Sequence, residues 1–279
     1  MIHLNAYRQR AAEAAEHLSS HGLAPVDAVL QCGSGLSGLV EGLLADATRI
    51  PLSEIPHLPA GTVAGHGSEA VSGTVGDARV LVFTGRLHIY EGHDAATAGF
   101  PAAIAAAAGA RLFICTNAAG ALNVDLRVGD VVVHDSYINH QGDNAAACLE
   151  FPHSAHRFVN PDPPYDTAAS RALALCLSKA GMQTHRGTYL AVRGPVFETD
   201  AELKMMRAWG GDAIGMSTVP EVIACHVLNL PVAGLSVLTN KCLDGNHTTH
   251  DGVLSASQAA IPQLVTALKM LFQEKQWLG

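Results

Sequence analysis

The sequence predicts an α/β fold: a single domain in which helices flank a mostly parallel sheet. Short apolar runs rich in β-branched residues alternate with helical patterns along the 279 residues, an order that builds parallel sheets. Hydrophobic residues make up 48% of the chain and charged residues only 15%, so one large core can be buried. No linker, repeat or low-complexity segment interrupts the chain, and we therefore expect residues 1–279 to form one domain.

The strands and helices follow from these periodicities. The apolar, β-branched runs predict strands at residues 28–31, 79–83, 112–116, 130–134, 186–192, 213–216 and 232–239. Helical patterns fill residues 5–21, 36–45, 96–108, 168–180, 200–209, 219–228 and a C-terminal stretch that ends near Trp277. Pro262 interrupts this last pattern and predicts a kink or a helix start. Residues 141–166 are rich in proline, and we expect a long irregular loop there.

Charge and cysteine usage narrow the class of protein. The net charge is -8 and no Lys/Arg cluster is present, which argues against a nucleic-acid partner. The six cysteines form no C-x-x-C pair, a usage typical of reduced thiols in the cytoplasm. The N-terminal pattern lacks a signal-peptide core, and no apolar run is long enough to cross a bilayer. We expect a cytoplasmic protein without a membrane partner.

The segment 194–199, with sequence GPVFET, places an aromatic ring beside a carboxylate where a strand gives way to a helix. Phe197 can stack on a flat heterocycle, and Glu198 can accept hydrogen bonds from its edge, so the segment suits a nucleobase. Thr199 and Glu202 have the spacing of a capping box that opens the helix. The alternative is a core Phe and a Glu that compensates the helix dipole.

Residues 33–38, with sequence GSGLSG, match the dinucleotide-binding fingerprint after an apolar strand. That fingerprint also needs an acidic residue at the end of the next strand, about 20 residues further on. The corresponding residues 51–56 are bracketed by prolines and have no β run before them. A simple phosphate loop that uses the Ser34 hydroxyl is therefore favoured over a dinucleotide site.

Arg86, His88 and Tyr90 alternate directly after a predicted strand, so they would project from one face of an extended segment. An Arg fork beside an imidazole suits an oxyanion, and the Tyr can border a sugar. The alternative is an edge strand whose polar face meets solvent.

Three further strand ends carry small or polar residues. Residues 116–123 end a strand in small side chains that expose backbone N–H groups to an anion or a flat ring. Ser217 lies at a predicted helix entrance, where Thr218 and Glu221 have capping-box spacing and Ser217 could itself be the cap. Asn240 closes the last strand. We expect these groups to meet at the carboxyl ends of the strands, where open α/β sheets bind ligands.

Across about residues 28–254, these motifs together resemble the trimeric purine nucleoside phosphorylases and their methylthioadenosine phosphorylase relatives. The resemblance implies a single α/β domain around a mixed, partly barrel-like sheet and assembly as a homotrimer. It implies phosphorolysis of purine nucleosides to the free base and ribose 1-phosphate, in purine salvage. No cofactor or metal is implied, and inorganic phosphate is the co-substrate.

The resemblance also implies roles for individual residues. Phosphate binding falls to Ser34, His66, Arg86, His88, the Ala118 backbone N–H and Ser217. The ribose would contact Tyr90, Met216, His250 and, from a neighbouring subunit, Phe158. The purine would contact Ala119, Gly120, Phe197, Glu198 and Asn240. The catalytic residues would be Asn240, Glu198 and His88, and His247 is a second candidate for the ribose histidine.

Hydrogen-bond chemistry predicts which purine fits. Glu198 as a carboxylate only accepts, which suits the N1–H of a 6-oxopurine and opposes the bare N1 of adenine. Asn240 can donate its amide N–H to O6, whereas an Asp there would favour an exocyclic amine. We therefore predict inosine, guanosine and their 2′-deoxy forms as substrates over adenosine or methylthioadenosine.

Three other functions compete with this one. A nicotinamide-dependent Rossmann-type oxidoreductase would use residues 33–38. A metal site could use His153 with His156 or His247 with His250, but neither pair belongs to a motif such as H-E-x-x-H. A purine-binding protein without activity would have no use for the second anion pocket that Arg86, His88 and Ser217 indicate.

Overall fold

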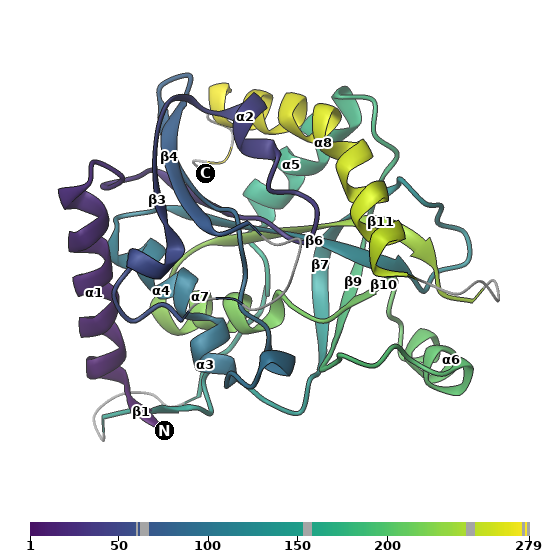
Figure 1. The fold of residues 1–279 in the computed structure, drawn as a ribbon. Helices are drawn as coiled ribbons and strands as arrows, with labels where there is room; N and C mark the ends of the chain where they lie inside the picture. The colour runs from purple at the N-terminus through teal and green to yellow at the C-terminus, as the bar shows by residue number, and fades with distance from the viewer. Residues whose placement is uncertain (60, 62–66, 153–157, 244–248, 275–276, 278–279) are drawn as a thin grey trace.

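The structure is a computed structural model that describes residues 1–59, 61, 67–152, 158–243, 249–274 and 277. Within these residues, a nine-stranded sheet has the order β10-β9-β7-β11-β6-β2-β5-β4-β3 (Figure 1). Its strands are β2 (Ala28–Gln31), β3 (Ala45–Pro51), β4 (Glu69–Val75), β5 (Ala78–Phe83), β6 (Leu112–Ala121), β7 (Val131–His140), β9 (Thr184–Val192), β10 (Ala213–Gly215) and β11 (Val232–Lys241). A separate parallel pair joins β1 (Ile2–His3) to β8 (Leu149–Glu150).

Strand β10 closes part of this sheet into a barrel. It pairs in parallel with β9 and antiparallel with β6, where Ala213 lies opposite Ala121 and Ile214 lies opposite Gly120. Strands β6, β11, β7, β9 and β10 form the barrel, and β2, β5, β4 and β3 continue the sheet outward from β6. This arrangement confirms the α/β class and the mixed, partly barrel-like sheet.

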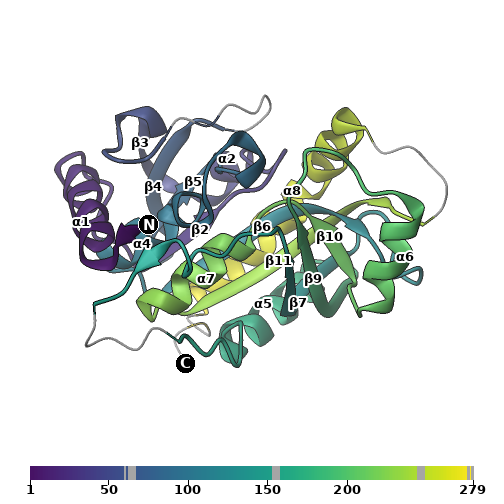
Figure 2. The same ribbon diagram turned by 90° about the horizontal axis from the view of Figure 1, so that it is seen from below.

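Helices cover both faces of the sheet (Figures 1 and 2). One layer contains α1 (Leu4–Ser20), α3 (Ala95–Ala98), α4 (Phe100–Ala107) and α7 (Val219–Leu228), and the other contains α2 (Leu39–Leu43), α5 (Thr167–Lys179) and α8 (His250–Gln273). Helix α6 (Asp200–Ala208) packs against the barrel through Leu203 and Met206. Successive side chains of a strand point to opposite faces of the sheet, so the hydrophobic core has two parts, one under each helix layer. Val29 of β2 faces the first layer, whereas its neighbour Leu30 faces the second.

The predicted strands are all present. The two-residue strands β1 and β8 were missed, and so were two strands of the large sheet, β3 and β4. Strand β3 has only Ile50 buried among its seven residues, so it lacks the alternation that reveals a strand from sequence. Strand β4 contains Gly73 and Ser72, which weaken a β pattern. Several predicted strands are also longer than expected, because small or polar residues at their carboxyl ends break the apolar run, as in residues 117–121 of β6.

The helix expected at residues 36–45 is wrong in extent. The structure has only the five-residue α2, followed directly by β3, because Gly38 and Gly42 weaken a helix there. Strand β3 also precedes residues 51–56, where no strand was expected. It lies at the outer edge of the sheet beside β4, whereas the neighbours of β2 are β5 and β6. It therefore does not supply the acidic position of a dinucleotide fold.

The remaining sequence features have mixed outcomes. Thr199 caps α6 in a capping box with Glu202, as predicted. The described part of residues 141–166 is irregular except for the two-residue β8. The chain stays helical through Pro262, so no helix starts there, and α8 bends along its length (Figure 1). No helix in the described ranges combines the length and apolarity needed to cross a membrane.

Candidate functional site

One cavity of about 510 Å³ is lined from the ends of β2, β5, β9, β10 and β11 and from β6. It brings together most of the predicted site residues, namely Ser34, Arg86, His88, Tyr90, Ala118, Ala119, Gly120, Phe197, Glu198, Met216, Ser217 and Asn240. We expected these residues to meet because the strands that carry them run in the same direction. In the structure, β9 and β10 run opposite to β6 and β11. Closure of the barrel, rather than a shared strand direction, brings these segments to one place.

Arg86 is held rigidly at the buried end of the cavity. Its Nε donates to Glu221 Oε1 at 2.7 Å, and its Nη1 donates to the Thr116 carbonyl at 2.8 Å and to Ser217 Oγ at 3.3 Å. Nη2 is buried and meets no acceptor among the described residues. Because a buried charged donor is costly to leave unpaired, Nη2 is a candidate donor to a ligand.

His88 is oriented by a neighbour for which the sequence suggested no role. Glu91 Oε1 lies 3.0 Å from His88 Nδ1 and accepts from the His88 backbone N–H at 2.9 Å. The His88 ring stacks on Tyr90 with 4.6 Å between centroids. Burial lowers the pKa of His88, and the hydrogen bond to Glu91 opposes that shift. The imidazole is thus fixed in direction by a carboxylate, as expected of a group that contacts a ligand.

The extended segment predicted for Arg86, His88 and Tyr90 is wrong. Strand β5 ends at Phe83, and Ile89–Glu91 forms a 3₁₀ turn. This turn, and not a period of two, places Tyr90 against His88. The three side chains nevertheless line one cavity, and they do not face solvent as an edge strand would require.

The glycine-rich loop after β2 has structural reasons for its glycines. A Cβ on Gly33 would lie 2.5 Å from Asn117 Cα and 2.8 Å from the Thr116 carbonyl oxygen of the adjacent strand. Gly35 has φ +75°, a conformation that side chains rarely adopt. These constraints explain the match to the dinucleotide fingerprint without a dinucleotide, and they leave Ser34 at the cavity wall.

Ser217 precedes a strained turn. Thr218 has φ 71° and ψ -48°, and the Val219 N–H donates to the Ser217 carbonyl at 2.8 Å, which together define a γ-turn. Such a backbone costs of order 1–3 kcal/mol and is typical of functional sites. The capping box expected from Thr218 and Glu221 is absent, since Glu221 is bound to Arg86 and neither Thr218 nor Ser217 caps α7 with its side chain.

The other end of the cavity is more open and carries the predicted purine contacts. Phe197 is 52% exposed, so its ring is available to a ligand. Burial raises the pKa of the half-buried Glu198 carboxyl, and the charge of Glu202 adds to that shift. A hydrogen bond donated by a ligand in the cavity would therefore stabilise the Glu198 carboxylate.

Asn240 is aimed into the cavity by an irregularity in β11. The register against β6 shifts between Leu238 and Asn240, so Thr239 is bulged and re-directs the next side chain. The Thr239 hydroxyl lies 3.1 Å from Asn240 Oδ1, and Asn240 Nδ2 lies 3.7 Å from Cys242 Sγ. A Cβ on Gly120 would be 3.1 Å from Asn240 Nδ2 and 2.3 Å from Cys242 Sγ, so only glycine leaves room for both.

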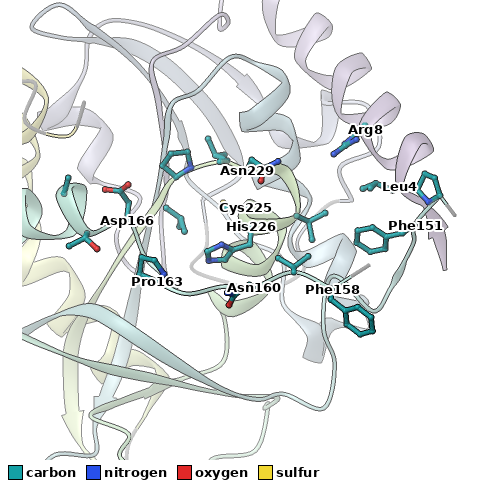
Figure 3. Close-up of a pocket in the computed structure, with 18 residues that line it drawn as sticks. Leu4, Arg8, Phe151, Phe158, Asn160, Pro163, Asp166, Cys225, His226 and Asn229 are labelled. Atoms are coloured by element: carbon teal, nitrogen blue, oxygen red, sulfur yellow. The ribbon is translucent and has the colours of Figure 1, made fainter. Parts of the chain in front are cut away.

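The remaining predicted residues lie outside the described part of the chain or, for Phe158, line another cavity. His66 and the alternative His247 lie outside the described residues, and His250 begins α8 with its side chain also outside them. Phe158 is 94% exposed and lies at a separate cavity of about 780 Å³ between α1, α7 and the segment before α5 (Figure 3). The two cavities share no lining residue.

The structure describes the side chains of neither histidine pair in the metal-site alternative. His153, His156 and His247 lie outside the described part of the chain, and the His250 side chain is also outside it. Within the described part, no three His, Cys, Asp or Glu side chains come together as metal ligands would.

Glu91, Asn117, Glu221 and Thr239 shape the cavity although the sequence suggested no such roles. Only Glu91 had a local signal, because a carboxylate three residues after His88 can reach back to it. Glu221 pairs with Arg86 across 135 positions, which no local pattern reveals.

Comparisons with known proteins agree with this geometry. A profile of the Phosphorylase superfamily matches residues 27–272. The chain is 36% identical to purine nucleoside phosphorylase 1 of Geobacillus stearothermophilus over 229 residues, which cover 81% of this chain and 83% of that protein. It is 34% identical to the purine nucleoside phosphorylase of Bos taurus over 268 residues, covering 93% and 92% of the two chains.

Solved structures give the same result. The crystal structure of Schistosoma mansoni purine nucleoside phosphorylase in complex with adenosine superposes with a TM-score of 0.88 at 28% identity, covering 95% of this chain and 97% of that chain. A Schistosoma enzyme in complex with hypoxanthine gives 0.87 at 27% identity, with the same coverage. By sequence and by fold, this chain belongs to the phosphorylase superfamily and, within it, to the purine nucleoside phosphorylases.

Proposed function

We propose that the protein cleaves 6-oxopurine nucleosides with inorganic phosphate, giving the free base and ribose or deoxyribose 1-phosphate. The observation that carries this proposal is a single cavity with two different ends. The buried end presents Arg86, His88 and Ser217 to an anion, and the open end presents Phe197, Glu198 and Asn240 to a base. A nucleoside and a phosphate together need both ends.

The chemistry follows from this placement. Phosphate held at Arg86 and Ser217 supplies negative charge beneath the sugar and stabilises the oxocarbenium character that develops there. Tyr90 and Met216 line the same cavity and would border the ribose. The departing purine gains negative charge on its five-membered ring, and Asn240 shares a hydrogen bond with N7 as that charge grows. No side chain forms a covalent bond to the substrate.

The choice of base is the finer part of the proposal. Glu198 accepts from N1–H and Asn240 donates to O6, so inosine and guanosine fit better than adenosine. Adenosine phosphorolysis is the second candidate, because one of the similar structures holds adenosine.

The first prediction tests the reaction itself. Cleavage of inosine or guanosine should require phosphate and yield ribose 1-phosphate, because Arg86 Nη2 at the buried end has no acceptor among the described residues. Product separation after incubation with each nucleoside, with and without phosphate, measures this. Free ribose as the product would make the protein a hydrolase, and a nicotinamide cofactor bound to the purified protein would revive the oxidoreductase.

We propose that the protein assembles as a homotrimer in which Phe158 of one subunit contributes to the site of its neighbour. Substitution of Phe158 tests this assembly. This aromatic side chain is 94% exposed, and large exposed apolar groups mark interaction surfaces. Replacing Phe158 by Ala should raise KM for the nucleoside roughly tenfold, the equivalent of one buried aromatic contact, while KM for phosphate stays nearly unchanged.

The matched control for that prediction is Leu175→Ala in α5, an exposed apolar residue at 47% for which we expect no change. Sedimentation under assay conditions should give a trimer. A fully active monomer would refute the shared site.

A further inference from the structure

A chain of hydrogen bonds leads from Ser217 away from the cavity into the core. We call it the buried relay, and its five side chains are His134, Ser236, Asn117, Thr218 and Ser217. His134 Nε2 lies 2.8 Å from Ser236 Oγ, which lies 2.7 Å from Asn117 Oδ1. Asn117 Nδ2 lies 2.8 Å from Thr218 Oγ1, which lies 3.1 Å from Ser217 Oγ. All five residues are buried.

Hydrogen-bond chemistry allows this relay two consistent directions. In the outward direction His134 Nε2–H donates to Ser236, Ser236 donates to the Asn117 carbonyl oxygen, the Asn117 amide donates to Thr218, and Thr218 donates to Ser217. In the inward direction every donor and acceptor is exchanged and the Asn117 amide is rotated. In the inward direction the Ser217 hydroxyl donates its proton to Thr218, and His134 Nε2 has to be unprotonated so that it can accept from Ser236.

His134 decides between the two directions. Its Nδ1 is buried and has no hydrogen-bond partner among the described residues, and a Cβ on Gly234 would lie only 2.4 Å from it. The inward direction would place a proton on Nδ1 and leave a buried N–H unpaired, whereas the outward direction leaves only a lone pair unpaired, which costs less. Burial lowers the pKa of His134 to about 3, so the ring is neutral and carries one proton. That proton belongs on Nε2.

The outward direction fixes what Ser217 can do. Its oxygen accepts from Thr218 and from Arg86 Nη1, which lies 3.3 Å away. The Tyr189 hydroxyl oxygen accepts the Ser217 backbone N–H at 3.3 Å, which helps to hold the backbone at Ser217. With its lone pairs occupied, the Ser217 hydroxyl has its proton left for the cavity.

We infer that the buried relay aims the Ser217 hydroxyl proton at the anion in the cavity, which makes His134, Ser236 and Thr218 positioning residues for anion binding. The identity of that anion as phosphate rests on the proposed function. The strained γ-turn at Thr218 fits this role, because the Asn117 bond to Thr218 holds the turn that presents Ser217.

The first test reads the direction of the relay without any turnover. In protein labelled with ¹⁵N-histidine, the His134 signals are assigned by their loss in His134→Gln. The expected spectrum is that of the Nε2–H tautomer, unchanged between about pH 5.5 and 8 because the pKa of His134 lies far below that range. An Nδ1–H tautomer would reverse the relay and overturn the inference.

The second test measures phosphate binding by calorimetry. Ser236→Ala removes the hydroxyl that orients the Asn117 amide, so the dissociation constant for inorganic phosphate should rise about three- to tenfold. The matched control is Ser72→Ala, since Ser72 is equally buried in β4 and its hydroxyl has no partner among the described residues. The control should bind phosphate as the unmodified protein does. Unchanged binding in Ser236→Ala would overturn the inference.

A double-mutant cycle separates positioning from general loosening of the core. In a Ser217→Ala background the relay has no hydroxyl to aim, so adding Ser236→Ala should cause no further loss of phosphate affinity. Full additivity would contradict the relay. If Ser236→Ala does not fold, Thr218→Val interrupts the same chain with a side chain of the same shape and is expected to give the same result.

Different results would refute the proposed function and the buried relay. A protein that binds phosphate through the relay but does not cleave nucleosides would refute the proposed function alone. A protein that cleaves nucleosides, with Ser236→Ala and Thr218→Val binding phosphate normally, would refute the relay alone.

Discussion

Replacing Arg86 with Met is expected to destabilise the fold by about 3 to 5 kcal/mol and to remove phosphate-dependent cleavage. The side chains of Arg86 and Glu221 are only 1% and 2% exposed, so the substitution leaves a carboxylate buried without its counterion. It also removes the donors that face the anion, and losing two charge-assisted hydrogen bonds should lower kcat/KM for phosphate by at least about a hundredfold. Urea unfolding and steady-state kinetics measure the two effects.

A second substitution separates these effects. In Arg86→Met/Glu221→Leu no charge is left buried, so most of the unfolding free energy should return while phosphorolysis should not. Arg49→Met is the matched control, because the ion pairs of Arg49 with Glu41 and Glu69 are exposed. We expect this substitution to lower the free energy of unfolding by less than about 1 kcal/mol and to leave the kinetics of phosphorolysis unchanged. Recovery of phosphorolysis in the double variant would show that Arg86 acts only through the fold.

Base choice should depend on Glu198 and Asn240. Asn240→Asp removes the donor that faces O6 and supplies an acceptor for an amine, so inosine turnover should fall while the ratio of adenosine to inosine turnover rises. Glu198→Ala should cost about ten- to a hundredfold with inosine, the equivalent of one charge-assisted hydrogen bond, and much less with adenosine. Rates on the two nucleosides with the same protein samples provide the internal control. Equal losses on both would assign these residues to the fold or to the sugar.

The pH dependence of inosine cleavage gives the same assignment another check. Burial raises the pKa of Glu198, and only its ionised form accepts from N1–H. As the pH falls, kcat/KM for inosine should therefore decline at a higher pH than an ordinary glutamate would impose. The decline should be absent in Glu198→Ala.

Sequence patterns predicted the parts of the site in which neighbours along the chain act together. Phe197 and Glu198 are adjacent, and Arg86 and His88 lie two positions apart, so one short motif carries each pair. The central strands were also visible, because burial on both faces makes their apolar runs continuous.

The missed features are those that only distant residues create. Glu221 had the spacing of a helix cap, yet the buried guanidinium of Arg86 is the stronger partner for its carboxylate. The bond between His134 and Ser236 joins two strands, and each residue alone resembles an isolated polar group in an apolar run. Barrel closure by β10 was expected from the family resemblance alone, because the three residues of β10 carry no sequence signal for its pairing with β6.

The cavity is unequally buried along its length, and this has a consequence for how the enzyme can evolve. Arg86, His88 and Ser217 are 4%, 5% and 7% exposed, whereas Phe197 is 52% exposed. A substitution at the buried end disturbs packing and an ion pair, so selection can change it only at the expense of folding. A substitution at the open end alters few contacts. If the two ends act as proposed, descendants of this protein can acquire new leaving groups while they keep phosphate as the nucleophile.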